Sequence, residues 1–105
     1  MRIISLNLDN DEEVESYTKA LKNKTRRKIL ELLEEEPLDL IELSERIGQT
    51  ESNMSKQIII LETLGLVDSI AFPASHGLRK ICFLKDDQRI IDKKRELRKI
   101  KKKDK

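Results

Sequence analysis

The chain has 105 residues, of which 40% are charged and 37% are hydrophobic, and its formal net charge is +2. This length fits one domain with a modest core, and it excludes the large dinucleotide-binding and barrel enzyme folds. The apolar residues are mostly Ile and Leu under a surface rich in Lys and Glu, and the aromatic residues are limited to two Phe and one Tyr. This composition is typical of a small helical protein.

The counts of single residue types exclude several kinds of site. With one cysteine and one histidine, one chain has neither an internal disulfide nor a metal site built from Cys or His clusters. No apolar run is long enough to span a bilayer, and residues 1–10 lack the pattern of a signal peptide. We therefore expect a cytoplasmic protein with no membrane association, no metal and no cofactor.

The charge is distributed unevenly along the chain. Residues 1–50 hold 8 basic and 12 acidic residues, whereas residues 51–105 hold 14 basic and 8 acidic ones. Residues 88–105 alone hold 10 basic and 3 acidic residues. A basic half joined to an acidic half favours one side that faces a polyanion and one that faces solvent or a partner. The alternative is a solvated surface helix with a basic end.

The first third of the chain predicts two helices. Residues 2–8 alternate apolar and polar residues, which fits a short strand or an ordered arm. Capping residues and helical periodicity then predict helices over residues 11–22 and 23–35. Their apolar residues are Val14, Tyr17 and Leu21 in the first, and Ile29, Leu30, Leu32 and Leu33 in the second.

The next segment predicts two helices joined by a tight turn. Asp39 and Glu42 have the spacing of a capping box, which starts a short helix that ends near residue 47. Gly48 stops this helix, and Thr50 caps a longer one that runs to about residue 64. The apolar residues are Leu40, Leu43 and Ile47 in the short helix, and Met54, Ile58, Leu61 and Leu64 in the longer one.

After Gly65 the pattern changes to that of strands. Residues 66–72 and 78–84 are rich in Ile, Val and Phe, and the loop 73–77 between them predicts a hairpin. Asp86 or Asp87 then begins a last helix with a thin apolar stripe. We interpret the chain as a single domain with a core over residues 11–85 and a basic helix and tail over residues 86–105.

This order of elements is the plan of a winged helix-turn-helix, a mainly α fold with a small β-hairpin. The helix over residues 50–64 begins with polar residues that suit DNA: Thr50, Glu51, Ser52, Asn53, Ser55, Lys56 and Gln57. Hydroxyls and helix N-terminal amides suit phosphates, while Asn and Gln suit adenine in the major groove. We expect Ser52, Asn53, Lys56 and Gln57 to read bases from one outer strip. The alternative is an ordinary capped helix with a polar surface.

Other residues near this helix carry weaker signals. Arg79 and Lys80 on the second strand fit phosphate contacts, although a solvent-facing strand explains them as well. Ile59 falls opposite the buried stripe, where it fits a thymine methyl, a partner or a simple exposed residue. Arg26 fits either phosphate or ion pairs with nearby glutamates, and Cys82 fits structural burial.

Four segments resemble the ArsR-type regulators: residues 20–30, 43–48, 52–58 and 61–67, within a match over about residues 14–85. The resemblance implies a homodimeric transcription regulator that binds double-stranded DNA at a pseudo-palindromic site. Metal-sensing members carry a cysteine pair in the first motif helix, where this chain has Glu42-Leu43-Ser44-Glu45, and others use His and Asp in the last helix, which here has no His. We therefore expect a member that does not sense metal; any small-molecule effector is unknown.

A core this small leaves the apolar stripes of the first and last predicted helices incompletely covered. Pairing these stripes across a two-fold axis would bury them, which predicts a homodimer. The candidate interface residues are Val14, Tyr17, Leu21, Ile90, Ile91 and Leu97. Two other functions stay open: a winged-helix module that docks a protein, and an architectural DNA-binding protein with low sequence specificity. An enzyme is not expected, because the sequence shows no nucleophile–base pair, carboxylate dyad or phosphate loop.

Overall fold

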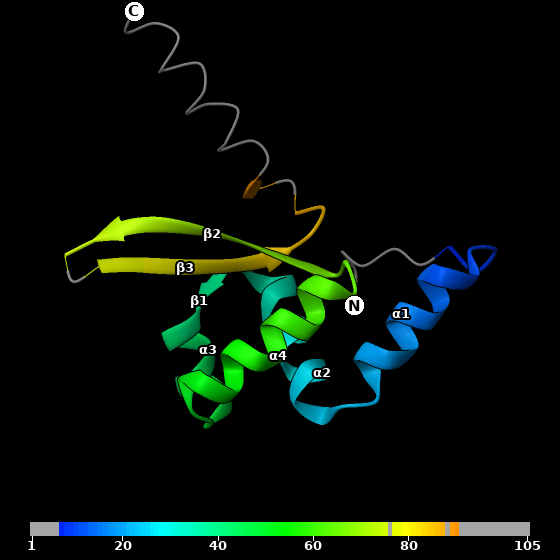
Figure 1. Cartoon of the computed structure of the whole chain (residues 1–105), viewed down its shortest axis with the longest axis horizontal. Coiled ribbons are helices and arrows are strands. Elements are labelled where there is room, and N and C mark those ends of the chain that lie inside the picture. The colour runs from blue at the N-terminus through cyan, green and yellow to red at the C-terminus, as the bar shows by residue number, and fades with distance from the viewer. Residues whose placement is uncertain (1–6, 76, 88, 91–105) are drawn as a thin grey trace, which may run out of the picture.

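The computed structural model describes residues 7–75, 77–87, 89 and 90. Its elements follow in the order α1 (Asp11–Leu21), α2 (Lys24–Glu35), β1 (Leu38–Asp39), α3 (Leu40–Ile47), α4 (Glu51–Thr63), β2 (Val67–Ala74) and β3 (Gly77–Leu84). Four helices with a small antiparallel sheet make up a winged helix-turn-helix, as expected (Figure 1).

The helices begin and end where the sequence provides caps. The side chain of Asn10 accepts a hydrogen bond from the Glu13 backbone N–H, and Asn23 caps α2 in the same way through Arg26. Each of these bonds is 3.1 Å long and satisfies one of the N–H groups that a helix start leaves unpaired. The four predicted helices are therefore confirmed, with ends within about one residue of the expected ones.

The sheet differs from the predicted hairpin in two ways. It has three strands in the order β1-β3-β2, because Leu38 pairs with Cys82 and Asp39 pairs with Ile81. The expected loop over residues 73–77 was also too long, since β2 and β3 pair as far as Ala74 and Gly77. Pro73 is compatible with β2 because β2 is an edge strand, in which every second N–H points away from the neighbouring strand and makes no ladder bond.

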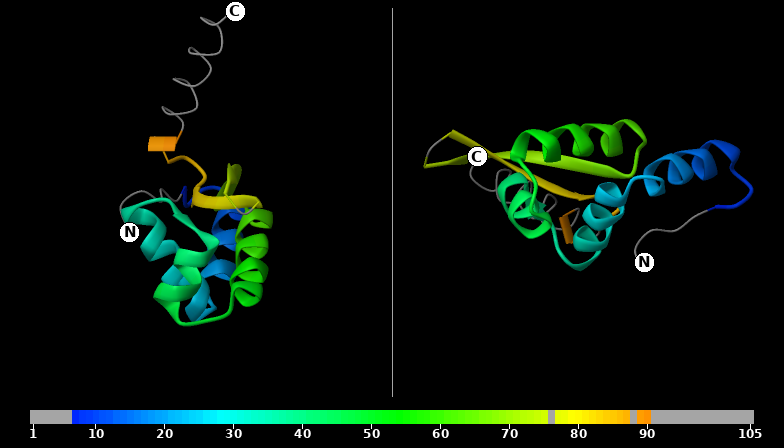
Figure 2. Two further views of the ribbon diagram at one scale, coloured as in Figure 1. Left: turned by 90° about the vertical axis from the view of Figure 1, so that its left-hand side faces the viewer. Right: turned by 90° about the horizontal axis from the view of Figure 1, so that it is seen from below.

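The helices α2, α3 and α4 pack on one side of the β2–β3 hairpin, whose far end projects past them (Figures 1 and 2). The core lies between these helices and the sheet. Its fully buried side chains come from every layer: Ile29, Leu30, Leu33, Leu38, Leu43, Met54, Ile58, Leu61 and Cys82. α1 lies at the opposite end from the hairpin tip and contacts mainly α2.

Several expectations fall partly or wholly outside the part of the chain that the structure describes. Of the expected arm over residues 2–8, only Asn7 and Leu8 are described, and neither is in a strand. Arg89 and Ile90 are helical, which agrees with the start of a last helix, but Ile91 and Leu97 are not described. The basic tail over residues 101–105 also lies outside the described ranges.

Candidate nucleic-acid interface

The turn between α3 and α4 holds the two helices in a fixed relation. Asp39 and Glu42 form the predicted capping box, with bonds of 2.7 Å and 3.3 Å between side chain and backbone. α3 then ends at Gly48, whose φ of 77° lies in the left-handed region that glycine adopts without strain. The hydroxyl of Thr50 accepts a 3.1 Å bond from the Asn53 backbone N–H and starts α4. The predicted helix-turn-helix is thus formed by its expected caps.

α4 buries one face and exposes another along its whole length. Met54, Ile58 and Leu61 are fully buried against the core. On the opposite face, Ser52, Lys56 and Ile59 are exposed at positions separated by four and three residues, which is the spacing of one helical strip. We call these three residues the outer strip. Glu51 is also exposed, whereas Ser55 is half-buried.

Two of the four expected base-reading residues do not lie on the outer strip. Gln57 is half-buried, and its amide oxygen accepts a 3.0 Å bond from Arg26 in α2. Asn53 is also half-buried, and its amide nitrogen donates to the Gln49 side chain, which in turn donates a 2.9 Å bond to Thr25. Of the four residues, Ser52 and Lys56 therefore face outward, whereas the amide of Asn53 turns toward Gln49 and that of Gln57 turns toward Arg26. That all four read bases stays a prediction.

Arg26 has a role that the sequence did not predict. Its guanidinium donates to the carbonyl oxygens of Lys19 at 3.0 Å and Ala20 at 3.3 Å, at the C-terminal end of α1. Arg27 donates a 2.5 Å bond to the Leu21 carbonyl. These cations satisfy carbonyl groups that the end of α1 leaves unpaired. Arg26 therefore connects α1, α2 and α4 through one side chain.

The β2–β3 hairpin is the wing of the fold, and its cations Arg79 and Lys80 have acidic partners within the chain. Arg79 forms an ion pair with Asp39, whose side chain is almost completely buried, and lies 3.8 Å from a carboxylate oxygen of Glu42. Lys80 lies 3.3 Å from Glu62, which also accepts a 2.8 Å bond from Ser69. Strand β1 brings Asp39 to this place, and β1 was not predicted. Both cations still reach the surface, since Arg79 is exposed and Lys80 is half-buried.

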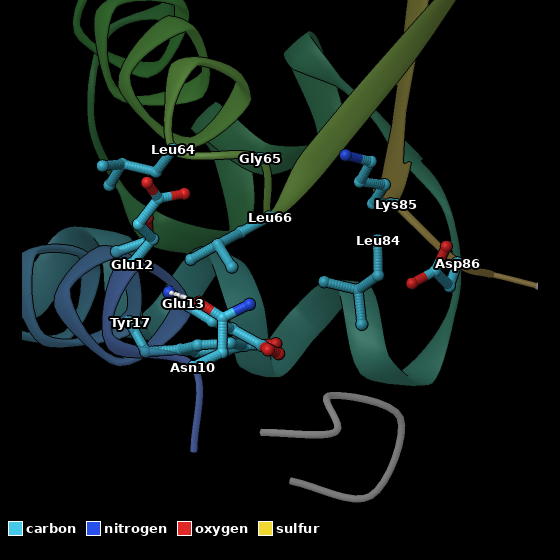
Figure 3. Close-up of a pocket in the computed structure, with 11 residues that line it drawn as sticks. Asn10, Glu12, Glu13, Tyr17, Leu64, Gly65, Leu66, Leu84, Lys85 and Asp86 are labelled. Atoms are coloured by element: carbon cyan, nitrogen blue, oxygen red, sulfur yellow. Dashed lines mark hydrogen bonds between the residues drawn. The ribbon is translucent and has the colours of Figure 1, made fainter. Parts of the chain in front are cut away.

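The expected dimer residues lie around α1 and the end of the described chain. Val14, Tyr17 and Ile90 are half-buried, and Leu21 is exposed. Tyr17 packs against the core, and burial, with smaller effects of Glu13 and Asp86, raises the pKa of its hydroxyl. A cavity of about 480 Å³ lies beside it, between α1, the turn at Gly65 and the end of β3 (Figure 3).

The position of Cys82 indicates a structural role for this residue. Cys82 is fully buried, as predicted, and burial raises its pKa to about 11, so the reactive thiolate is disfavoured at neutral pH.

Among residues 7–75, 77–87, 89 and 90, no three His, Cys, Asp or Glu side chains gather as a metal site would require. Within the same ranges, none of the helices has both the length and the apolar character needed to cross a membrane.

Comparison with known proteins agrees with this geometry. The model of the bacterial regulatory protein family arsR matches residues 23–69, which run from the cap of α2 into β2. Among solved structures, reduced HlyU from Vibrio cholerae is 27% identical with a TM-score of 0.62, over 71% of this chain and 75% of that one. None of the curated protein sequences gives a significant match.

Two more distant structures share the fold. One is the homodimeric winged helix-turn-helix DNA-binding domain of a possible ArsR-family transcriptional regulator from Mycobacterium bovis. It is 22% identical with a TM-score of 0.61, and the match covers 85% of this chain and 80% of that one. The other is the transcriptional regulator HlyU from Vibrio vulnificus, 23% identical with a TM-score of 0.58, over 85% and 91% of the two chains.

Proposed function

We propose that this chain, whose residues 23–69 match the arsR family model, is a winged helix-turn-helix transcription regulator of that family that binds specific double-stranded DNA sequences. In this proposal α4 enters the major groove and the β2–β3 hairpin lies against the flanking backbone. A chromosome-binding role implies a cytoplasmic protein. The proposal includes no enzymatic activity, since the matched family and the similar solved structures are described as regulators.

The observation that carries the proposal is the exposed N-terminal half of α4. Ser52 and Lys56 lie on the outer strip, while the buried face of the same helix is fixed to the core by Met54 and Ile58. Thr50 holds the helix start, where backbone N–H groups suit a phosphate. A rigid helix that presents a hydroxyl and a cation at one end is suited to contact base edges and the adjacent backbone.

We further propose that two copies bind one operator. The Mycobacterium bovis domain is described as a homodimer, and this chain has half-buried or exposed apolar residues on α1 and at Ile90 that a partner copy would cover. The proposed interface residues are Val14, Tyr17, Leu21, Ile90, Ile91 and Leu97. A two-fold dimer of this kind binds two half-sites about 10 base pairs apart.

We propose that the regulator does not sense a metal. The resemblance implies that metal sensors carry their cysteine pair in the first motif helix, where this chain has Glu42-Leu43-Ser44-Glu45. Carboxylates spaced in this way on a helix do not replace a thiolate pair as ligands for soft metal ions. Glu42 is also already used in the capping box of α3.

Selection of bound duplexes from a random pool tests the proposed function. The purified chain is mixed with the pool at about 150 mM salt with heparin as competitor, and the enriched sequences are read. We expect a pseudo-palindrome, and weaker binding of it by Lys56→Ala. The matched control Lys85→Ala changes an exposed lysine beyond the end of β3 and is expected to bind as the wild type does. Failure to enrich any sequence would contradict the proposal and favour a protein-docking module or an architectural DNA-binding protein.

A further inference from the structure

The outer strip of α4 carries both polar and apolar side chains. Ser52 and Lys56 occupy its first two turns, and Ile59 follows on the same strip with 53% of its surface exposed. The neighbouring Ile60 is 39% exposed. A helix that only needs solubility carries polar residues on this face, and here two large apolar side chains extend it toward the C-terminus.

Three other polar side chains near this strip form hydrogen bonds inside the protein. The amides of Asn53 and Gln57 bond to Gln49 and Arg26. The hydroxyl of Thr63, one turn after Ile59, donates a 2.8 Å bond to the Ile59 carbonyl oxygen. The hydrogen-bonding side chains that remain on the outer strip are therefore Ser52 and Lys56. Any further base discrimination by this strip has to come from an apolar contact.

An apolar side chain in the major groove has one distinctive target. The 5-methyl group of thymine is the apolar feature that base pairs present there, whereas the other groups on base edges are hydrogen-bond donors and acceptors. Along α4, Lys56 and Ile59 are separated by about 4.5 Å at a rise of 1.5 Å per residue. This is close to the spacing of about 3.4 Å between successive bases on one strand, so the two side chains fit neighbouring base steps.

We propose that Ile59 is a specificity-determining residue that contacts the 5-methyl group of a thymine in each half-site. This inference rests on the proposed function, because it assumes that α4 lies in the major groove. Lys56 suits the O6 and N7 atoms of a guanine, so the thymine is expected within about two base steps of a guanine. Ile59 needs no rearrangement for this contact, since its side chain is already exposed on the strip.

The test removes the methyl group and the isoleucine separately. In the selected duplex, each thymine is replaced in turn by deoxyuridine, which differs only in lacking the 5-methyl group. We expect one position per half-site at which the wild-type affinity falls by about fourfold, the effect of burying one methyl-sized apolar group. Ile59→Ala is expected to bind the thymine duplex more weakly by a similar factor, and to show no further loss when that thymine becomes deoxyuridine.

Two matched variants separate this contact from effects on folding. Ile59→Val keeps a β-branched apolar side chain and is expected to keep the preference for thymine. Ile41→Ala removes another exposed isoleucine, one that belongs to α3 and is 48% exposed, and it is expected to keep the wild-type response to deoxyuridine. Circular dichroism spectra of all variants are expected to match, since each substituted side chain is exposed and neither alanine nor valine breaks a helix.

The possible failures are distinguishable. If no duplex is enriched from the random pool, the proposed function fails and this inference fails with it. If a specific duplex is bound but no thymine-to-deoxyuridine change reduces affinity, only the role of Ile59 is overturned. The same conclusion follows if Ile59→Ala and the wild type lose equal factors at the same thymine, because the methyl group is then recognised by another side chain.

Discussion

Arg26 and Gln57 show how one side chain links three helices. The guanidinium of Arg26 donates to two carbonyl oxygens of α1 and to the amide oxygen of Gln57 on α4. These bonds link both α1 and α4 to α2. The sequence could not show this, because residues 26 and 57 are 31 positions apart and each also suits contact with DNA.

Arg26→Ala is therefore expected to destabilise the protein more than Gln57→Ala does. Losing one hydrogen bond of a half-buried amide costs about 0.5–1.5 kcal/mol, whereas removing Arg26 breaks three. Urea unfolding measures both changes, and the double variant measures their coupling. Lys28→Ala, an exposed residue of the same helix, serves as the control. If Gln57→Ala and Lys28→Ala reduced the free energy of unfolding equally, the hydrogen bond between Arg26 and Gln57 would contribute nothing to stability.

Asp87 and Arg89 form a second link, between the end of β3 and the end of α2. Arg89 bonds to both carboxylate oxygens of the buried Asp87, at 2.6 Å and 2.9 Å, and donates to the Glu35 carbonyl oxygen. The hydrogen bonds from Arg89 lower the pKa of Asp87 below its ordinary value, although burial acts in the opposite direction. Asp87 therefore stabilises the fold in its ionised form.

This link predicts a specific pH dependence. Because the pKa of Asp87 is lower in the folded state than in the unfolded one, its stabilisation is present above the unfolded pKa of about 3.9 and is lost as the pH falls further through the folded pKa. Asp87→Asn is expected to be less stable than the wild type at pH 7, with the difference shrinking below about pH 4. Urea unfolding across this range checks it. Asp86→Asn changes the exposed neighbouring residue and serves as the control. If its stability differed from that of the wild type with a similar pH dependence, the assignment to Asp87 would be contradicted.

At the scale of elements, the helices were predictable because their signals are local. Asn10, Asp39 and Thr50 cap helices within a few residues of themselves, and Gly48 ends α3 through its own backbone conformation. Strand β1 was not predictable, since two residues carry no periodicity and their partners lie in β3, more than 40 positions later. The exposure of Ser52 and Lys56 on the outer strip followed from helical spacing, but the inward turn of the amides of Asn53 and Gln57 depended on Gln49 and Arg26.

Strand β1 gives Asp39 two separate roles, and two substitutions distinguish them. One oxygen caps α3, and the other pairs with Arg79 of the wing. Asp39→Asn keeps a good cap but loses the charge, whereas Asp39→Ala loses both. We expect Asp39→Ala to be the less stable variant by about 1 kcal/mol, the usual effect of a helix cap. Thermal unfolding measures the difference, and equal stability of the two variants would contradict a capping role.

At the scale of the whole molecule, α1 and the segment after β3 leave apolar side chains for a second copy. Leu21 is 39% exposed and lies away from the core, so Leu21→Glu is expected to weaken the dimer without unfolding the protomer. Light scattering at tens of micromolar is expected to give about twice the chain mass of 12.3 kDa for the wild type. Leu8→Glu, another exposed leucine outside the proposed interface, is the control. A wild-type species of a single chain mass would contradict the dimer.

The ion pairs of the wing reduce the positive charge that the protein surface presents to DNA. Arg79 and Lys80 are paired with Asp39 and Glu62, so part of their charge is already balanced within the protein. Non-specific attraction by phosphate contacts alone is then smaller than the number of basic residues suggests. In the proposed complex, specific binding is therefore expected to depend more on the outer strip of α4, where Ser52, Lys56 and Ile59 are exposed.

The most direct test of this account is the ratio of affinities for the selected duplex and for a scrambled duplex of the same composition. Fluorescence anisotropy at about 150 mM salt measures both. A regulator that reads base edges through α4 is expected to bind the selected duplex at least about 10³-fold more tightly, with the ratio reduced in Lys56→Ala. A ratio near one would contradict sequence-specific recognition by this helix.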